Sequence, residues 1–412
     1  MASTKRPKSC PNPIETPSLS AQEVAENDDL LIEILVRLPL KSLITFKSVS
    51  IRWLSLISDP HFCRRRLNPL HNRAASGLFL SRFFNSDEIS FISLNQNRMN
   101  NHFRLPFTIL SSVRKRPESI KVLQSCNGLL LCSGIVKPCK GPINRTRIRT
   151  RNRYVYNPTT NHYTKLPQPS HALCESGCSD LHFSLAFDPS KSNHYKVVCV
   201  RLVPEMEVEI YSSETGLWRL CKRRFFTRRL CPKFPISDFN LHGGVFWNGA
   251  LHWIGTRGYA LYFNLDEDDE RLRRLPLPCS TPEVWSHSVR YFGESGGHLH
   301  LAGINDSPST QLNVYELERD YSVDPRDGDG FDLADLSFKI VCVVRCEVEE
   351  ESYLVMRITG GIVIYGLTTQ TFKKLCDIDD DEDDDFVVDA GDEIIDLGWS
   401  RAYQYIESLA CA

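Results

Sequence analysis

The stretch YNPTTNHYTKL, residues 156–166, reveals the architecture of most of the chain, because variants of it recur further along. The unit starts with an aromatic residue after an apolar run, continues through a polar turn and ends in leucine. The later copies are YSSETGLWRL at 211–220, FNLDEDDERLRRL at 263–275, a degenerate YELERD at 315–320 and YGLTTQTFKKL at 365–375. The leading aromatic residues are therefore 55, 52, 52 and 50 residues apart.

This repeat predicts a β-propeller. Short apolar or alternating runs are separated by Gly, Pro, Asn and Asp, which is the pattern of strands joined by tight turns. The segment Val245–Trp253 is the clearest example, because Asn248-Gly249 joins two apolar runs and is a strong hairpin signal. A period of ~50 residues with four short strands per unit is typical of kelch-type blades. A β-sandwich is the competing architecture for the same strands.

Residues 75–410 are expected to form this β domain, with about six blades. Five units are visible, and residues 78–94 together with residues 402–409 supply strands for a sixth. A blade shared between the two ends of the domain would close the ring and protect the sheet edges. No long amphipathic helix interrupts this region, which argues against a parallel α/β fold.

Residues 27–66 have a helical period instead. The first apolar stripe lies on one helix face and ends before Pro39; it consists of Leu30, Leu31, Ile34, Leu35 and Leu38. The second stripe has Ser42 as its expected N-cap and consists of Leu43, Phe46, Val49, Trp53 and Ile57. About 40 residues cannot bury so many large side chains alone, so part of this surface must face a partner or the rest of the chain. The predicted fold class is α+β multidomain, with a small N-terminal all-α domain followed by a large all-β domain.

Composition indicates where the protein acts. Residues 1–26 are rich in Pro, Ser, Thr and Glu, so we expect a disordered tail without a signal peptide. The 15 cysteines are odd in number and contain no CxxC pair, as expected for reduced thiols in the cytoplasm or nucleus. Lys5-Arg6-Pro7-Lys8 fits a short nuclear-import pattern. The net charge of −2 and the shortness of every apolar run argue against nucleic acid or a membrane as the main partner.

The helical segment resembles the F-box motif. The matching stretch is DDLLIEILVRLPLKSLITFKSVSIRWLSLISDPHF, residues 28–62. The family usually opens with Leu-Pro just before the acidic residue, whereas this chain has Glu26-Asn27 there. This departure concerns one edge contact of the motif and leaves the rest of the match intact.

The remainder, about residues 75–410, resembles the F-box-associated domain of plant F-box proteins. The segments that carry this resemblance are SCNGLLL at 125–131, YNPTT at 156–160, FDP at 187–189 and YIESL at 405–409. They are shorter and more degenerate than the helical match.

The resemblance implies a role in ubiquitin transfer. F-box proteins dock their helical module on a Skp-type adaptor, which links them to a cullin–RING ligase, while the second domain holds a protein substrate. The implied adaptor-binding residues are Leu30, Ile34, Leu35, Leu38, Pro39, Leu43, Val49 and Trp53. The chain itself would then be a non-enzymatic subunit without a cofactor. The alternative function is a β-propeller binding module that works without the ligase, on RNA, a glycan or an acidic protein.

Three other patterns could carry chemistry. The spacing of His171, Cys174, Cys178 and His182 offers four zinc ligands, although structural zinc sites usually have tighter pairs and coincidence is the favoured explanation. Two basic clusters could contact RNA or an acidic peptide, although exposed loops made soluble by arginine are the favoured interpretation; the candidate substrate-binding residues in them are Arg147, Arg149, Arg151, Arg224 and Arg228. The segment GESGG at 293–297 matches a nucleophile elbow, but an alternating run follows it, so we expect a hairpin turn.

Overall fold

The computed structural model divides into two compact units, residues 1–66 and residues 67–412. It describes residues 23–24, 26–66, 75–81, 89–94, 119–135, 151–169, 181–203, 205–225, 239, 241, 243–255, 259–265, 270–275, 277, 289–305, 311–324, 331–332, 338–346, 348–358, 361–377, 402–410 and 412. The expected N-terminal tail lies almost entirely outside these residues. Within the part of the chain that is described, no helix is long and apolar enough to cross a membrane.

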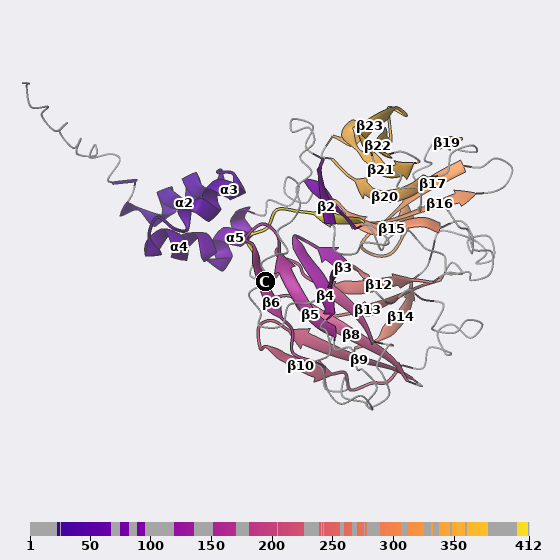
Figure 1. Cartoon of the computed structure of the whole chain (residues 1–412), viewed down its shortest axis with the longest axis horizontal. Helices are drawn as coiled ribbons and strands as arrows, with labels where there is room; N and C mark the ends of the chain where they lie inside the picture. Colours follow the sequence, from indigo (N-terminus) through magenta and orange to yellow (C-terminus); the bar gives the residue numbers. More distant parts are fainter. Residues whose placement is uncertain are drawn as a thin grey trace, which may run out of the picture. The chain divides into compact units, whose positions relative to one another are not determined.

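The first unit contains short helices (Figure 1). They are α2 (Asp28–Val36), α3 (Leu40–Phe46), α4 (Ile51–Ser58) and α5 (Pro60–Arg66). Polar side chains fix three of their starts. Asn27 accepts hydrogen bonds from the amides of Asp29 and Leu30, and Ser50 and Asp59 do the same for α4 and α5. These side chains satisfy amides that have no partner inside their own helix.

The second apolar stripe forms two helices rather than one. The predicted N-cap Ser42 is wrong, because this residue lies inside α3, and Pro39 occupies the position before that helix. The chain leaves the helical path between Lys47 and Ser50, and Ser50 then begins α4 by accepting a hydrogen bond from the amide of Trp53 at 3.1 Å. The break lets α3 and α4 pack against each other and share one small core.

The second unit consists of six antiparallel sheets, as the repeat predicted (Figure 1). Blade 1 contains β1 (Gly77–Ser81), β2 (Ile89–Ser93) and β24 (Ala402–Tyr405). Blade 2 contains β3 (Ser119–Cys126), β4 (Leu129–Ile135), β5 (Arg151–Asn157) and β6 (His162–Lys165). Blade 3 contains β7 (Leu181–Ala186), β8 (Lys196–Val203), β9 (Glu205–Ser212) and β10 (Leu217–Leu220).

The other blades follow in chain order. Blade 4 contains β11 (Val245–Trp247), β12 (Ala250–Ile254), β13 (Ala260–Asn264) and β14 (Leu272–Leu275). Blade 5 contains β15 (Val289–Ser295), β16 (His298–Asn305), β17 (Gln311–Leu317), β18 (Val323–Asp324) and β19 (Phe331–Asp332). Blade 6 contains β20 (Phe338–Val344), β21 (Tyr353–Ile358), β22 (Gly361–Gly366) and β23 (Phe372–Asp377), with the short 3-10 helix Glu349–Glu351 before β21.

The blades form a closed ring. The inner strand of each blade contacts the next in the order β3, β7, β11, β15, β20 and β24, and β24 contacts β3 again. In blade 1 the C-terminal strand β24 pairs with β1, with Phe79 opposite Tyr403. The prediction that the two ends of the domain share a blade is confirmed, and that blade is blade 1. The β-sandwich alternative is wrong.

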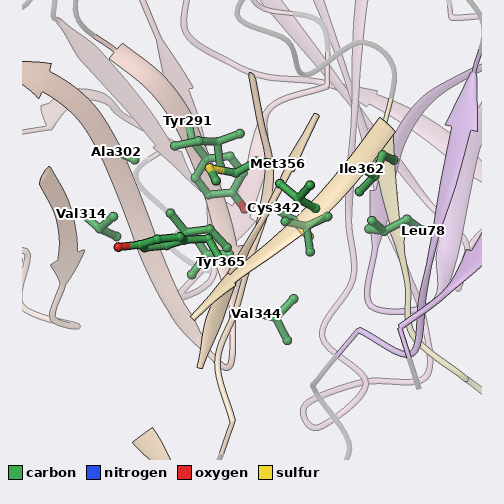
Figure 2. Close-up of a cluster of buried hydrophobic side chains, with 14 of the residues drawn as sticks. Leu78, Tyr291, Ala302, Val314, Cys342, Val344, Met356, Ile362 and Tyr365 are labelled. Carbon is green, nitrogen blue, oxygen red and sulfur yellow. The ribbon is translucent and has the colours of Figure 1, made fainter. Parts of the chain in front are cut away.

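Apolar side chains fill the spaces between blades. One cluster joins blades 5, 6 and 1, and Figure 2 shows Leu78 of β1 in the same cluster as Cys342, Met356 and Ile362 of blade 6. Buried cysteines belong to this packing. Burial raises the pKa of the Cys132 thiol to about 12, so this thiol stays protonated and behaves as a small apolar side chain.

Candidate functional site

Exposed apolar side chains are concentrated in the helical unit. Of the nine large exposed apolar side chains among the described residues, five belong to this unit: Leu30, Ile34, Val49, Ile51 and Leu54. Leu30 and Ile34 are four residues apart and therefore lie on the same face of α2. Ile51 and Leu54 are three residues apart on α4. A folded unit that leaves this much apolar surface in water has the chemistry of a docking site.

The eight predicted adaptor-binding residues fall into different environments. Leu30, Ile34, Pro39 and Val49 are exposed, and Leu38 and Trp53 are half-buried. Leu35 and Leu43, in contrast, are completely buried in the core of the chain. They pack inside the helical unit and are not accessible to solvent.

Sequence reasoning missed two exposed residues, Ile51 and Leu54. Ile51 is 87% exposed, the largest value among the exposed large apolar side chains. The missed signal was the position of each residue around the helix: Ile51 lies on the side of α4 away from Trp53 and Ile57, and Leu54 lies at the edge of the stripe that these two residues form. An apolar residue off the buried stripe is exposed and therefore available to a partner.

Hydrogen bonds from two arginines hold α4 and α5 against the two ends of α2. Arg52 of α4 donates from Nε and Nη2 to one carboxylate oxygen of Asp28 at 2.8 and 2.6 Å, and from Nη2 to the carbonyl of Glu26 at 2.7 Å. Arg66 donates from Nη1 to the carbonyls of Val36 and Leu38 at the end of α2. Glu26 and Asn27, which replace the Leu-Pro that usually opens the F-box motif, therefore have structural roles. Asn27 caps α2, and the carbonyl of Glu26 accepts a hydrogen bond from Arg52.

In the second unit, the four segments that carried the family resemblance meet at one place. The side-chain amide of Asn157 donates to the carbonyls of Ser408 and Ala410 at 3.0 and 2.7 Å. The Thr159 hydroxyl lies 3.0 Å from the hydroxyl of Tyr405. YNPTT therefore holds YIESL, the segment that begins at Tyr405, the last residue of the closing strand β24.

The SCNGLLL segment completes this junction. Asn127 donates from Nδ2 to the carbonyl of Phe187 in the FDP segment at 2.7 Å. Gly128 has φ +90°, and a Cβ there would lie 2.4 Å from the Cβ of Ser408. Only glycine combines this conformation with so close an approach of the C-terminal segment. We call Asn127, Gly128, Asn157, Thr159 and Ser408 the closure junction.

A cavity of about 120 Å³ lies among the inner strands. Its lining includes Gln124, Gly244, Glu294 and Gln404, so its walls carry backbone, amide and carboxylate groups. The Gln124 side chain is buried and donates from Nε2 to the carbonyls of Leu185 and Gly244 at 2.9 and 2.6 Å. These hydrogen bonds join β3 to blade 3 and to the residue before β11.

Most of the candidate substrate-binding and metal-binding residues cannot be placed. Arg147, Arg149 and Arg228, with His171, Cys174 and Cys178, lie outside the described residues. The backbone of Arg151 starts β5, and His182 lies on β7.

Among the five candidate substrate-binding arginines, Arg224 is the one whose side chain is described. It is exposed and pairs with Glu207 at 3.1 Å, and Glu207 also pairs with Arg201. A second acid, Glu270, pairs with Arg219. Burial alone would raise the pKa of Glu270, but the hydrogen bond and charge of Arg219 outweigh it and hold the pKa below its usual value. The basic cluster near Arg224 is thus partly neutralised by acids of blades 3 and 4.

The GESGG segment forms a hairpin turn, as predicted. Ser295 ends β15 opposite His298 of β16, and Gly296 and Gly297 make the turn at φ +62° and +88°. Ser295 is buried and its hydroxyl accepts a hydrogen bond from the amide of Arg345 at 3.2 Å. A strand follows the serine here, whereas a nucleophile elbow leads into a helix.

Comparison with known proteins gives two family matches. The F-box domain model matches residues 27–65, and the F-box associated beta propeller domain model matches residues 82–294. F-box protein At5g07610 of Arabidopsis thaliana is 33% identical, over 95% of this chain and 94% of that protein. F-box protein At5g49610 of the same plant is 31% identical, over 71% of this chain and 76% of that protein. Among solved structures, TolB from Acinetobacter baumannii aligns with 76% of this chain and 67% of its own at 10% identity, with a TM-score of 0.37.

Proposed function

The chain belongs to the F-box proteins that carry an F-box-associated β-propeller domain, and from this premise we propose that it is the substrate-recognition subunit of an SCF-type ubiquitin ligase. The observation that carries the proposal is the exposed apolar surface of the helical unit. In this role the unit docks a Skp-type adaptor, and the adaptor links the chain to a cullin–RING ligase. The protein works in the cytoplasm or nucleus.

The exposed and half-buried apolar residues of the helical unit define the docking surface. It consists of Leu30, Ile34, Leu38, Pro39, Val49, Ile51, Trp53 and Leu54, and we call it the adaptor face. A central apolar cluster with an aromatic anchor is the usual form of a binding hot spot, and Trp53 supplies that anchor. Leu35 and Leu43 contribute indirectly, because they hold α2 and α3 in place.

The propeller holds the target in this proposal. The chain contributes no chemical step and acts by proximity, since binding the ligase and the target together raises the effective concentration of the target at the transfer site. Substrate specificity belongs to loops on the propeller surface. Arg147, Arg149, Arg151, Arg224 and Arg228 remain candidates for contacts to an acidic target.

A single substitution tests the docking surface. Ile34→Asp places a carboxylate at an exposed position, so the free protein keeps its fold, but adaptor binding would bury an unpaired charge. We expect the affinity for a plant Skp-type adaptor to fall at least ~30-fold, the effect of losing a hot-spot residue. The measurement is isothermal titration calorimetry with the full chain.

Leu217→Asp is the matched control. Leu217 is 68% exposed on β10 of the propeller, so the same chemical change occurs outside the adaptor face. We expect this variant to bind like the wild type. Equal binding by wild type and Ile34→Asp, or no binding by the wild type, would reject the proposal and leave a propeller binding module that acts without the ligase.

A further inference from the structure

Two histidines and two glutamates face each other across neighbouring strands of blade 5. In the β16–β17 pair, His300 is opposite Glu316 and Leu299 is opposite Leu317. Alternate residues of a strand project to the same face of the sheet. His298 and His300 therefore share one sheet face with Glu316 and, just beyond the end of β17, with Glu318.

Three of these side chains bring potential metal ligands together. The Nδ1 atom of His298 lies 2.8 Å from Oε1 of Glu316. One ligand atom from each of His298, Glu316 and Glu318 lies within 4.8 Å of the other two. A tetrahedral zinc ion with bonds of about 2.1 Å needs ligand atoms about 3.4 Å apart. The Glu318 side chain is exposed, so rotation of its carboxylate can close the remaining distance.

A hydrogen bond from Arg345 orients the carboxylate of Glu316. Arg345 donates from Nη2 to Oε2 of Glu316 at 2.9 Å and from Nε to Nε2 of His300 at 3.2 Å. Arg345 thus occupies one oxygen of Glu316 and leaves Oε1 directed toward His298. Partners of this kind fix the ligands of many metal sites. His300 itself is completely buried, and its Nδ1 atom has no hydrogen-bond partner.

Access and burial also suit an ion. Glu316 is buried, with its side chain only 6% exposed, whereas the His298 side chain is 42% exposed. One wall of the cluster is therefore fixed in the protein and the other is open to solvent. An ion can enter from water and keep one water molecule as a fourth ligand.

We propose that His298, Glu316 and Glu318 form a binding site for a divalent transition-metal ion, with zinc as the first choice. Nδ1 of His298 and one carboxylate oxygen from each glutamate are the ligands. The mixture of one imidazole and two carboxylates suits zinc or manganese, because imidazole favours the former and carboxylate the latter. A bound ion would tie the start of β16 to the end of β17, next to Arg345 of blade 6.

Calorimetric titration of the metal-stripped full chain with Zn²⁺ tests this site. The chain carries Cys174→Ser and Cys178→Ser, which remove the two thiols of the other zinc-ligand set predicted from the sequence and leave only its histidines, His171 and His182. We expect one ion per chain, and at least tenfold weaker binding in Glu318→Gln. This variant changes an exposed side chain and keeps the fold, which circular dichroism verifies. His298→Ala is expected to behave in the same way.

His162→Ala is the matched control, because His162 is an exposed histidine on another blade. Substitution with Co²⁺ adds an independent test, since nitrogen and oxygen ligands give visible bands without a thiolate charge-transfer band. Equal affinity in wild type, Glu318→Gln and His298→Ala would overturn the proposal. So would a wild type that takes up neither Zn²⁺ nor Mn²⁺, because the cluster would then be only a hydrogen-bonded ion network.

Discussion

The side chain of Asn157 makes four hydrogen bonds inside the propeller. Its Nδ2 donates to the carbonyls of Ser408 and Ala410, and its Oδ1 accepts from the amides of Thr159 and Thr160. Asn157 is fully buried, so its removal would leave several polar groups without partners or water. This single residue connects the turn after β5 to the C-terminal segment.

Asn157→Ala is therefore expected to destabilise the propeller by about 2–3 kcal/mol, the cost of leaving buried polar groups unsatisfied. Chemical denaturation followed by tryptophan fluorescence measures the change. Asn193→Ala, at a half-exposed asparagine in a turn of blade 3, is the control and should change stability by less than about 0.5 kcal/mol. If both variants are equally stable, Asn157 does not hold the C-terminal segment.

His252 gives the propeller a dependence on pH. It is completely buried between Trp247, Tyr262 and Tyr321, with Nδ1 3.2 Å from the carbonyl of Val245 and Nε2 3.2 Å from the hydroxyl of Tyr321. Burial lowers its pKa from 6.5 to about 4. Between these two values the unfolded chain binds a proton that the folded chain excludes, so protonation favours unfolding.

Stability should thus be complete above pH 6.5 and fall as the pH is lowered toward 4, at up to ~1.4 kcal/mol per pH unit. Denaturation midpoints of the wild type at pH 7.5, 6.0 and 5.0 measure this fall. His252→Gln should flatten the dependence, whereas the exposed His162→Gln should leave it unchanged. The same slope in wild type and His252→Gln would contradict the assignment.

At the scale of elements, apolar periodicity predicted that helices exist but not where they end. Leu43, Phe46, Val49, Trp53 and Ile57 keep a three-to-four-residue spacing across the break between α3 and α4. The pattern cannot detect such a break, because the apolar side chains stay near one core on both sides of it. The polar cap Ser50 was the local signal that marked the new helix start.

Ser50→Ala removes this cap and should destabilise the helical unit by about 1 kcal/mol. Thermal unfolding followed by circular dichroism at the helical wavelengths measures the effect. Ser55→Ala is the control, because Ser55 is exposed inside α4, where alanine is the better helix former. A stable Ser50→Ala variant would mean that packing alone fixes the start of α4.

Hairpins were easier to predict than helix ends. The Asn248-Gly249 turn predicted from the sequence joins β11 to β12, with φ values of +48° and +77°. Both residues favour this left-handed region, so a short sequence is enough to identify the turn. The cross-strand register of β16 and β17 is different, because nothing local pairs His300 with Glu316, and the sequence did not indicate the cluster.

The closing strand β24 is the element on which the ring depends. It pairs with β1 on one side and contacts β3 and β20 on the other. Tyr403 of this strand donates a hydrogen bond to the carbonyl of Val122 at 2.6 Å. Without β24, the inner edge of β1 would be left unpaired and open to water and to other chains, and β3 and β20 would lose a neighbour.

A chain that ends at residue 401 should therefore lose the cooperative unfolding of the propeller and become sensitive to protease. Limited proteolysis and the denaturant dependence of fluorescence measure both effects. A chain that ends at residue 410 keeps β24 and YIESL and is the control, expected to behave like the full chain. A cooperative transition in the shorter chain would show that the ring closes without β24.

At the scale of the whole molecule, the repeat spacing and the two ends of the domain predicted the six-bladed ring. The convergence of SCNGLLL, YNPTT, FDP and YIESL was not predictable, because these segments are up to 280 residues apart and meet only when the ring closes. In the helical unit, the burial of Leu35 and Leu43 was likewise not predictable from the sequence. A stripe identifies which residues are apolar, whereas burial depends on how the helices pack.

The division into two units gives each part of the molecule a separate task in the proposed function. The adaptor face belongs entirely to the first unit, and the closed ring keeps the second unit folded independently of the adaptor. Adaptor binding should therefore change only the first unit.

Hydrogen–deuterium exchange of the full chain, with and without a plant Skp-type adaptor, measures this directly. We expect slower exchange in α2 and from Val49 to Leu54 when the adaptor is present, with unchanged exchange in the six blades. No protection in residues 27–66, or protection confined to the propeller, would contradict this expectation.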